Sequence, residues 1–368
     1  MRSRHAASPW QTGRRVKKFL LLLGVLLGAL LVAEVVCRMV LEDPLEADRT
    51  NSSTWRVEGL VADPELAYSF QPGYSGRMAL GDEYDLPFHI NGQGLRDEVD
   101  FAPEHPGVRR ILLLGDSFVF GVGVAFEDTL GEQLERALDL GEAGGLPVEV
   151  VPVGVPGYGP DDYALLAERW VPRVHPDLVL VALFTGNDIY DCDIKRSDPK
   201  VVVEGYLVSR RQAWSYNIRK YSVLDNLALQ SFAPGRVEQP RAKTATEVEA
   251  MCRTMGPWLS RLAAVSQDGG PPVAMLILYG KDYITNLKRS GKGYTIKGLA
   301  DVLRVMRHLG MTVLDPQDVW TAEDATVERY FFPRDAHHTA AGNRMMAEWT
   351  AATLRQQFPT WATSQGAR

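Results

Sequence analysis

The sequence lacks the features that mark several common classes of protein. Three cysteines in 368 residues are too few for a disulfide framework, and no histidine and cysteine cluster has metal-site spacing. In an oxidising compartment Cys192 and Cys252 can pair, although two free thiols are an equally good interpretation. The formal net charge is −6, so the basic surplus typical of nucleic-acid-binding proteins is absent. We therefore expect a globular protein that binds no nucleic acid and needs no metal ion or organic cofactor.

One long apolar run stands out against this composition. Residues 19–37 read FLLLLGVLLGALLVAEVVC and carry a single charged side chain, Glu34. At ~1.5 Å per residue, a helix of this length roughly crosses the ~30 Å hydrocarbon core of a membrane. Residues 1–18 contain six basic side chains and no acidic one, whereas residues 38–49 contain four acidic and two basic ones. The positive-inside rule then predicts a cytoplasmic tail over 1–18, a transmembrane anchor over 19–37, and a periplasmic or extracellular remainder.

Three other interpretations of this run fit less well. A cleaved signal peptide has a shorter apolar region and small residues at its cleavage site, whereas this run ends in Glu-Val-Val-Cys-Arg. A lipoprotein has a small residue before its modified cysteine, and here Val36 precedes Cys37. A buried core helix would show an amphipathic pattern, which the run does not have. An uncleaved anchor is the preferred prediction, and cleavage stays open.

The pattern of apolar residues and turn formers divides the rest of the chain into a lead-in and a main domain. Residues 38–105 are a polar linker followed by short apolar stretches between turn formers, which predicts a small β-rich lead-in. Residues 106–360 alternate short apolar runs with helix-like segments. Within them, residues 189–245 form an insertion that is long for a connection between a strand and a helix.

Five runs in the main domain are apolar on both faces, as buried parallel strands are. They are RRILLLG (109–115), VEVVPVG (148–154), DLVLVALF (177–184), VAMLILY (273–279) and MTVLD (311–315). Helix-like segments separate or follow them at about 127–140, 161–173, 246–266, 296–309 and 340–356. This alternation predicts an α/β fold with a doubly wound, five-stranded parallel sheet in a flavodoxin-like sandwich.

The first strand leads into a candidate nucleophile. Ligand sites in such sheets form beyond the carboxyl ends of the strands, and this strand ends in Gly115-Asp116-Ser117-Phe118 before helix-like sequence. A serine at a sharp turn from strand to helix presents its hydroxyl beside the N–H groups of a helix N-terminus. A solvated N-cap serine is the plain alternative.

Three further segments can complete such a site. Residues 154–159, GVPGYG, let a backbone N–H approach a ligand at Gly157, and residues 185–188, TGND, supply the Asn187 amide. The segment RDAHHTAAGN (334–343) places Asp335 just before His337 and His338, as an acid that orients a general base requires. Each segment alone is also explained by a tight turn or a helix cap. Their joint position at strand ends favours one site.

These segments together resemble the SGNH, or GDSL-type, hydrolase superfamily over residues 109–356. The motifs are RRILLLGDSFVFGVGV, VPVGVPGYGPDDY, LFTGND and RDAHHTAAGNRMMAE, while INGQGLRDE (90–98) resembles the approach segment of a membrane-anchored bacterial branch. The resemblance implies that Ser117 is the nucleophile and that its N–H, the Gly157 N–H and the Asn187 side chain bind an oxyanion. It also implies that Asp335 and a neighbouring histidine complete a triad.

The resemblance leaves two candidates for the histidine. The spacing Asp-x-x-His selects His338, whereas the five-residue step to the helix glycine Gly342 selects His337. The Asp-x-His form of the anchored branch also supports His337, which is the preferred prediction.

The expected function is ester hydrolysis outside the cytoplasm, on O-acyl esters of a carbohydrate or lipid. An O-acyltransferase for envelope or exported polysaccharide would use the same triad, and a non-catalytic binding module on the same fold is the third interpretation. Specificity is expected in the insertion 189–245, which contains several aromatic side chains. The insertion is either an aromatic-walled lid or cleft at the site, or an accessory helix that its aromatic side chains pack against the domain. These side chains are Tyr190, Tyr206, Trp214, Tyr216, Tyr221 and Phe232.

Overall fold

The computed structural model divides the chain into two compact units. One comprises Met1–Asp48 with Trp214–Pro240, and the other comprises Arg49–Ala213 with Arg241–Arg368. The structure describes residues 9–40, 58–80, 82–139, 146–188, 200–203, 206–209, 245–290, 298–321 and 326–359. Most of the insertion 189–245, including Cys192, lies outside these residues, as does the side chain of Cys252, so the pairing of the two cysteines stays a prediction.

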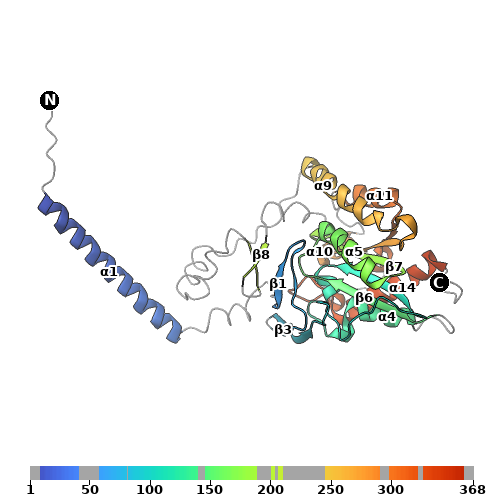
Figure 1. The fold of residues 1–368 in the computed structure, drawn as a ribbon, viewed down its shortest axis with the longest axis horizontal. Helices are drawn as coiled ribbons and strands as arrows, with labels where there is room; N and C mark the ends of the chain where they lie inside the picture. The colour runs from blue at the N-terminus through green and yellow to red at the C-terminus, as the bar shows by residue number, and fades with distance from the viewer. Residues whose placement is uncertain are drawn as a thin grey trace, which may run out of the picture. The chain divides into compact units, whose positions relative to one another are not determined.

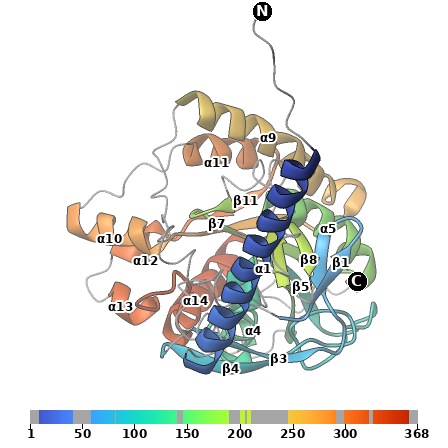
Figure 2. The same cartoon turned by 90° about the vertical axis from the view of Figure 1, so that its left-hand side faces the viewer.

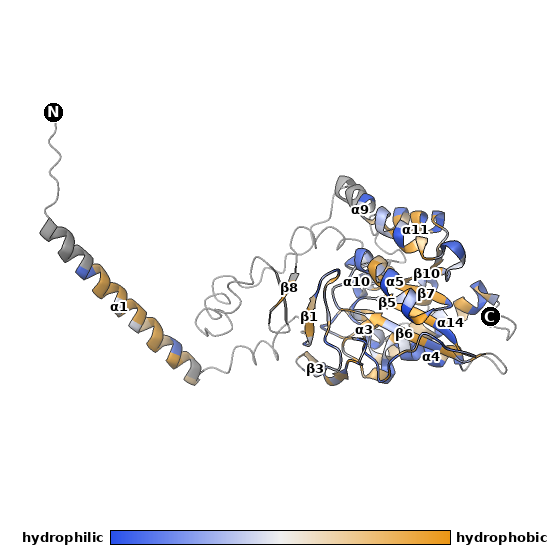
Figure 3. Cartoon of the chain, viewed as in Figure 1, coloured by the Kyte–Doolittle hydropathy of each residue, from blue (hydrophilic) through white to orange (hydrophobic). Residues whose placement is uncertain are grey.

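In the first unit, the described residues form the single helix α1, Pro9–Val40. Its segment Lys17–Cys37 is 21 residues long, is apolar enough to cross a membrane, and buries no side chain in the protein. The face of this segment seen in Figure 3 is largely hydrophobic, and large apolar side chains such as Leu21, Leu22 and Leu23 are exposed at successive positions along it. The expected apolar helix is therefore present.

In the second unit, five parallel strands form the central sheet in the order β11-β10-β7-β5-β6 (Figure 1). The bounds are β5 Arg109–Gly115, β6 Val148–Gly154, β7 Leu178–Phe184, β10 Val273–Leu278 and β11 Thr312–Leu314. This is the doubly wound order of a flavodoxin-like sheet, so the predicted fold class is confirmed. The five expected strands are all present, and the last three are one or two residues shorter than expected.

Helices cover both faces of this sheet (Figure 2). The helices α4 (Leu130–Asp139) and α14 (Ala340–Gln357) pack together on one face, and α9 (Ala245–Ala264) packs with α5 and α11 on the other. The last two span Pro160–Val174 and Leu299–His308. The short helix α3, Ser117–Phe120, lies where helix-like sequence was expected after the first strand, and η1, Phe126–Asp128, overlaps the start of the expected segment 127–140. Further short elements, which the sequence did not predict, are η2 Gln267–Gly269, α10 Lys281–Ser290, α12 Gln317–Thr321 and α13 Val327–Tyr330.

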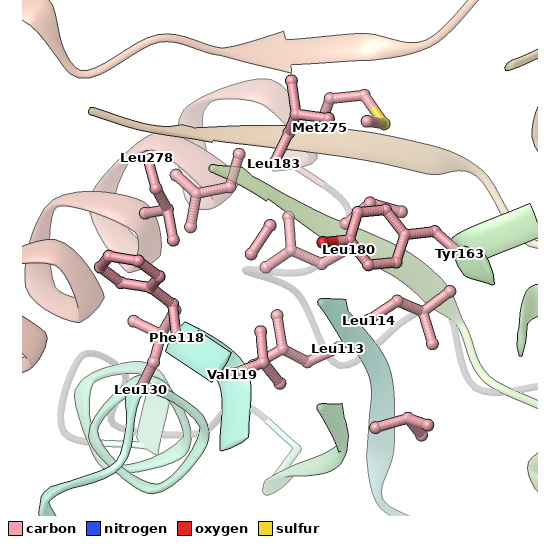
Figure 4. Packing of buried hydrophobic residues seen from close by; sticks show 14 of the residues in the cluster. Leu113, Leu114, Phe118, Val119, Leu130, Tyr163, Leu180, Leu183, Met275 and Leu278 are labelled. Atoms are coloured by element: carbon pink, nitrogen blue, oxygen red, sulfur yellow. The ribbon is translucent and has the colours of Figure 1, made fainter. Parts of the chain in front are cut away.

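The core lies between the sheet and its two helical layers. Leu113 and Leu114 of β5, Leu180 and Leu183 of β7, and Met275 of β10 are all fully buried (Figure 4). Consecutive strand residues point to opposite faces, so a strand covered on both sides must be apolar at every position. This explains why the strands read as unbroken apolar runs.

Three hairpins in this unit form two-stranded sheets that are separate from the central sheet. The lead-in forms two antiparallel pairs, β1 with β2 and β3 with β4, and a third pair joins β8 with β9. Their bounds are Leu60–Asp63, Ala67–Phe70, Ser75–Leu80, Tyr84–His89, Lys200–Val203 and Tyr206–Ser209. Side chains of the first two hairpins, such as Tyr68 and Met78, belong to the same hydrophobic core as the central sheet.

The outer edge of β6 is met by side chains of the neighbouring helix α4. The Val148 N–H donates to the Asp139 carboxylate at 2.9 Å, and the Val150 N–H donates to Glu135 at 2.8 Å. The next residue on this edge is Pro152, which has no N–H. Acceptors from α4 thus occupy the first two outward N–H groups of this strand.

Candidate active site

Strand β5 delivers Ser117 to the carboxyl edge of the sheet. It lies between β6 and β7, and the chain crosses to these two neighbours in opposite directions, which makes this the point where ligands bind in open α/β sheets. Asp116 caps the short helix α3 by accepting from the Phe118 N–H at 2.9 Å. Gly154, paired with Gly115 on β5, lets β6 pass close to this turn, because a Cβ there would lie 2.2 Å from the Phe120 nitrogen.

A chain of hydrogen bonds joins Ser117 to a histidine and an aspartate. The Nε2 atom of His337 lies 2.7 Å from the Ser117 Oγ, and its Nδ1 atom lies 2.5 Å from the Asp335 Oδ1. The His337 backbone N–H also donates to Oδ1, at 3.2 Å. Each of the three residues is 6% exposed. A hydroxyl, an imidazole and a carboxylate in this order can remove a proton from the hydroxyl and stabilise the resulting imidazolium.

The second candidate histidine points elsewhere. His338 is 2% exposed and its ring packs against Phe118, Phe331 and Trp320. Burial lowers the pKa of His338 from its ordinary value of 6.5 to about 3. Of the two histidines, the structure therefore brings His337 to Ser117 and places His338 in an aromatic cluster behind it.

The carboxylate of Asp335 has a second partner. Its Oδ2 atom accepts from the Tyr84 hydroxyl at 2.7 Å. Burial acts to raise the pKa of Asp335, but the hydrogen bonds from His337 and Tyr84 outweigh it, so the pKa is lowered. Asp335 is consequently ionised at neutral pH, which is the state that can hold an imidazolium.

The other two expected oxyanion donors, besides the Ser117 N–H, follow the ends of the strands that flank β5. Gly157, in the turn after β6, has φ of +81°, a left-handed conformation that suits glycine, and a Cβ would lie 2.9 Å from the Tyr68 hydroxyl. Asn187 is half-buried in the turn that follows β7. Asp188 fixes that turn by accepting from the Phe184 N–H at 2.9 Å and the Tyr163 hydroxyl at 2.8 Å.

Sequence reasoning missed several residues that support the site. Tyr84 belongs to the lead-in hairpin, where a tyrosine gives no functional signal. Arg96 lies in the segment 90–98 that carries the resemblance, yet no role was expected for it. Its guanidinium donates to the carbonyls of Phe120, Gly121 and Val124 at 2.8, 2.6 and 2.8 Å, and so holds the loop behind the serine turn.

The described residues contain no candidate metal site. No cluster of three or more His, Cys, Asp or Glu side chains there could hold a metal ion.

Among known proteins, the chain is similar to a set of solved structures. No family model and no curated protein matches the chain. A lipase/acylhydrolase from Enterococcus faecalis matches with 13% identity over 68% of this chain and 96% of its own, at a TM-score of 0.40. A carbohydrate acetylesterase from Sinorhizobium meliloti matches with 12% identity over 68% and 100%, at 0.34. A two-domain esterase active on acetylated mannans matches with 13% identity over 71% and 52%, at 0.41.

Proposed function

We propose that the chain is a serine ester hydrolase of the SGNH kind. The observation that carries this proposal is the hydrogen-bonded series Ser117–His337–Asp335 at the carboxyl edge of a doubly wound sheet. A buried serine hydroxyl 2.7 Å from an imidazole that is itself held by a carboxylate is the arrangement needed for an activated nucleophile. The sequence motifs around these residues support the same assignment.

In this mechanism His337 acts first as base and then as acid. The Ser117 Oγ attacks the ester carbonyl carbon, its proton moves to the His337 Nε2, and the carbonyl π electrons move to the oxygen. When the tetrahedral intermediate collapses, the ester C–O bond breaks and His337 returns the proton to the leaving alcohol. A water molecule then repeats both steps on the acyl-enzyme and releases the carboxylic acid. Asp335 remains ionised throughout.

The negative oxygen of the intermediate requires donors near Ser117. We assign this role to the Ser117 N–H at the start of α3, the Gly157 N–H and the Asn187 side-chain amide. Their support is their position: they follow β5, β6 and β7, the three adjacent strands at whose ends the serine lies. Each such donor is typically worth ~3 kcal/mol in the transition state.

We also propose that α1 holds the enzyme in a membrane with the catalytic unit outside the cytoplasm. The support is the length and all-round apolarity of Lys17–Cys37, together with six basic side chains in residues 1–18. O-acyl esters of envelope carbohydrates or lipids are the substrates such a position makes available. If the acyl group passes to a sugar hydroxyl and not to water, product analysis with and without a glycan acceptor will show it.

The deciding experiment is covalent labelling combined with turnover. The wild-type chain should react with a fluorophosphonate probe and hydrolyse p-nitrophenyl esters, and Ser117→Ala should lose both. Ser260→Ala is the matched control, because that serine lies exposed on α9 and donates to the Gly256 carbonyl of its own helix. Retained turnover in Ser117→Ala would show that the nucleophile has been misplaced, and an unlabelled, inactive wild type would favour a binding module.

A further inference from the structure

The acid of the site is held by a hairpin that precedes the sheet in the chain. Tyr84 opens strand β4, 251 residues before Asp335, and its hydroxyl lies 2.7 Å from the Asp335 Oδ2. Tyr84 is 7% exposed and Asp335 is 6% exposed, so water does not substitute easily for either partner. A hydrogen bond to a buried charged group is among the stronger ones in proteins.

The two oxygens of this carboxylate have separate tasks. Oδ1 accepts from the His337 ring and backbone, whereas Oδ2 accepts from Tyr84. With both oxygens engaged, the carboxylate cannot rotate about its terminal bond without breaking one of these contacts. Tyr84 thereby fixes the direction in which Oδ1 faces the imidazole.

The neighbouring residue on the hairpin holds the backbone of the same loop. Glu83 accepts from the Asp335 N–H at 3.1 Å and from the Arg334 N–H at 2.5 Å. The Arg334 guanidinium also forms ion pairs with Glu83 and with Asp82. The hairpin therefore contacts the acid loop through both a side chain and the main chain.

We propose that Tyr84 is a positioning residue of the catalytic triad, which holds Asp335 in the orientation and charge state that His337 requires. The inference rests on the proposed function, since it gives Tyr84 a part in the same ester hydrolysis. It also makes the β3–β4 hairpin a component of the active site, although the hairpin lies outside the segment 109–356 that resembles the hydrolase superfamily.

The charges around this contact favour a donating tyrosine. Burial raises the pKa of Tyr84, and the nearby carboxylates of Asp335 and Glu83 raise it further, so the hydroxyl keeps its proton at every working pH. The Asp335 carboxylate faces two groups directly, the His337 ring and the Tyr84 hydroxyl. Arg334, the preceding residue in the chain, supplies a positive charge that pairs with Glu83. Without the Tyr84 donor, the Asp335 carboxylate becomes a stronger base and draws a proton to the coupled Asp335–His337 pair more readily.

Tyr84→Phe tests the proposal because it removes the hydroxyl and keeps the ring. The ring packs against Phe332, with 5.2 Å between the two ring centroids. We expect kcat to fall about tenfold with KM unchanged, the loss typical of one hydrogen bond to a charged group. The acid limb of the kcat/KM profile should move to higher pH. Tyr279→Phe is the matched control, since Tyr279 is buried and its hydroxyl donates at 2.8 Å to the carboxylate of Asp315, which is not a triad residue. It should change neither kcat nor the pH profile.

A double-mutant cycle separates positioning from a general effect on folding. In the background Asp335→Asn, the further change Tyr84→Phe should have almost no effect on kcat, because the carboxylate it holds is gone. Equal losses in both backgrounds, or an unshifted pH profile in Tyr84→Phe, would overturn the proposal while Ser117-dependent hydrolysis stands. If Ser117→Ala retains turnover, the proposed function fails first, and the two failures are thus distinguishable.

Discussion

His338 offers a sharp test because the site excludes it for a reason that can be measured. Its ring lies among Phe118, Phe331 and Trp320, and burial lowers its pKa to about 3. A solution pH of 7 lies about four units above this pKa. Protonating the imidazole at pH 7 therefore costs about 5 kcal/mol, at ~1.36 kcal/mol per unit. A group with this cost cannot take the proton of a serine efficiently. We therefore expect His338→Phe to keep kcat within a few-fold of the wild type.

The same burial predicts how stability depends on pH. In the unfolded chain the His338 pKa returns to its ordinary 6.5, so the unfolded state binds a proton that the folded state refuses. Stability is thus lost as pH falls below 6.5 and continues to be lost until about pH 3. At pH 4.5, two units below 6.5, this loss amounts to roughly 2–3 kcal/mol.

Urea unfolding at pH 7.5 and 4.5 measures this difference. The wild type should lose about 2–3 kcal/mol more than His338→Phe between these pH values. His308→Gln serves as the control, since that histidine is exposed at the end of α11, and its pH dependence should match that of the wild type. If His338→Phe and wild type lose stability equally, His338 is not buried as described. If His338→Phe is inactive while folded, the general base has been assigned to the wrong histidine.

Four further predictions follow from other contacts. His337→Ala should lower kcat by about 10⁴-fold with folding intact, as measured by ester turnover and circular dichroism. Arg96→Met should lower the unfolding free energy by about 3 kcal/mol in urea titrations, because three buried carbonyls lose their donor, and Arg96→Lys should recover only part of it. Burial raises the pKa of Glu135 to about 7, which costs stability as pH rises from 4.5 to 7, so Glu135→Gln should gain about 1–2 kcal/mol at pH 8 after allowance for partial exposure. A reporter fused after residue 60 should be active only outside the cytoplasm, and cytoplasmic activity would contradict the proposed topology.

The sheet and its edge could be predicted from the sequence because burial on both faces leaves a local signature. Each strand is an unbroken apolar run, and residues 109–115 and 148–154 were predicted with the bounds that the structure has. The polar helix α10 escaped prediction, since charged and polar residues make up most of Lys281–Ser290 and no strong apolar run marks it. The hydrophobic pattern of the sequence therefore locates elements whose faces are completely buried. It misses short elements, such as α10, whose residues are mostly polar.

The relation of Ser117, His337 and Asp335 could be anticipated for a similar reason. Strand ends in a parallel sheet meet at one edge, so the positions of Ser117 and Asp335 next to strand or helix ends bring them into one region. The step from His337 to Gly342 then pointed to the histidine that the structure places at the serine. Tyr84 left no such trace, because its contact with Asp335 spans 251 residues and exists only after the hairpin packs against the sheet.

The capped edge of β6 has a consequence for how copies of this chain behave when they crowd together. An open edge strand is a template on which a strand of another molecule can add, and sheet growth of this kind leads to aggregation. On β6, Asp139 and Glu135 already occupy two of the outward N–H groups, and Pro152 offers none. The opposite edge, β11, is three residues long and gives an incoming strand little to pair with. The two edges of the sheet thus discourage the addition of a strand from another molecule by different means. On β6 the backbone donors are already occupied, and on β11 the strand is too short to pair with.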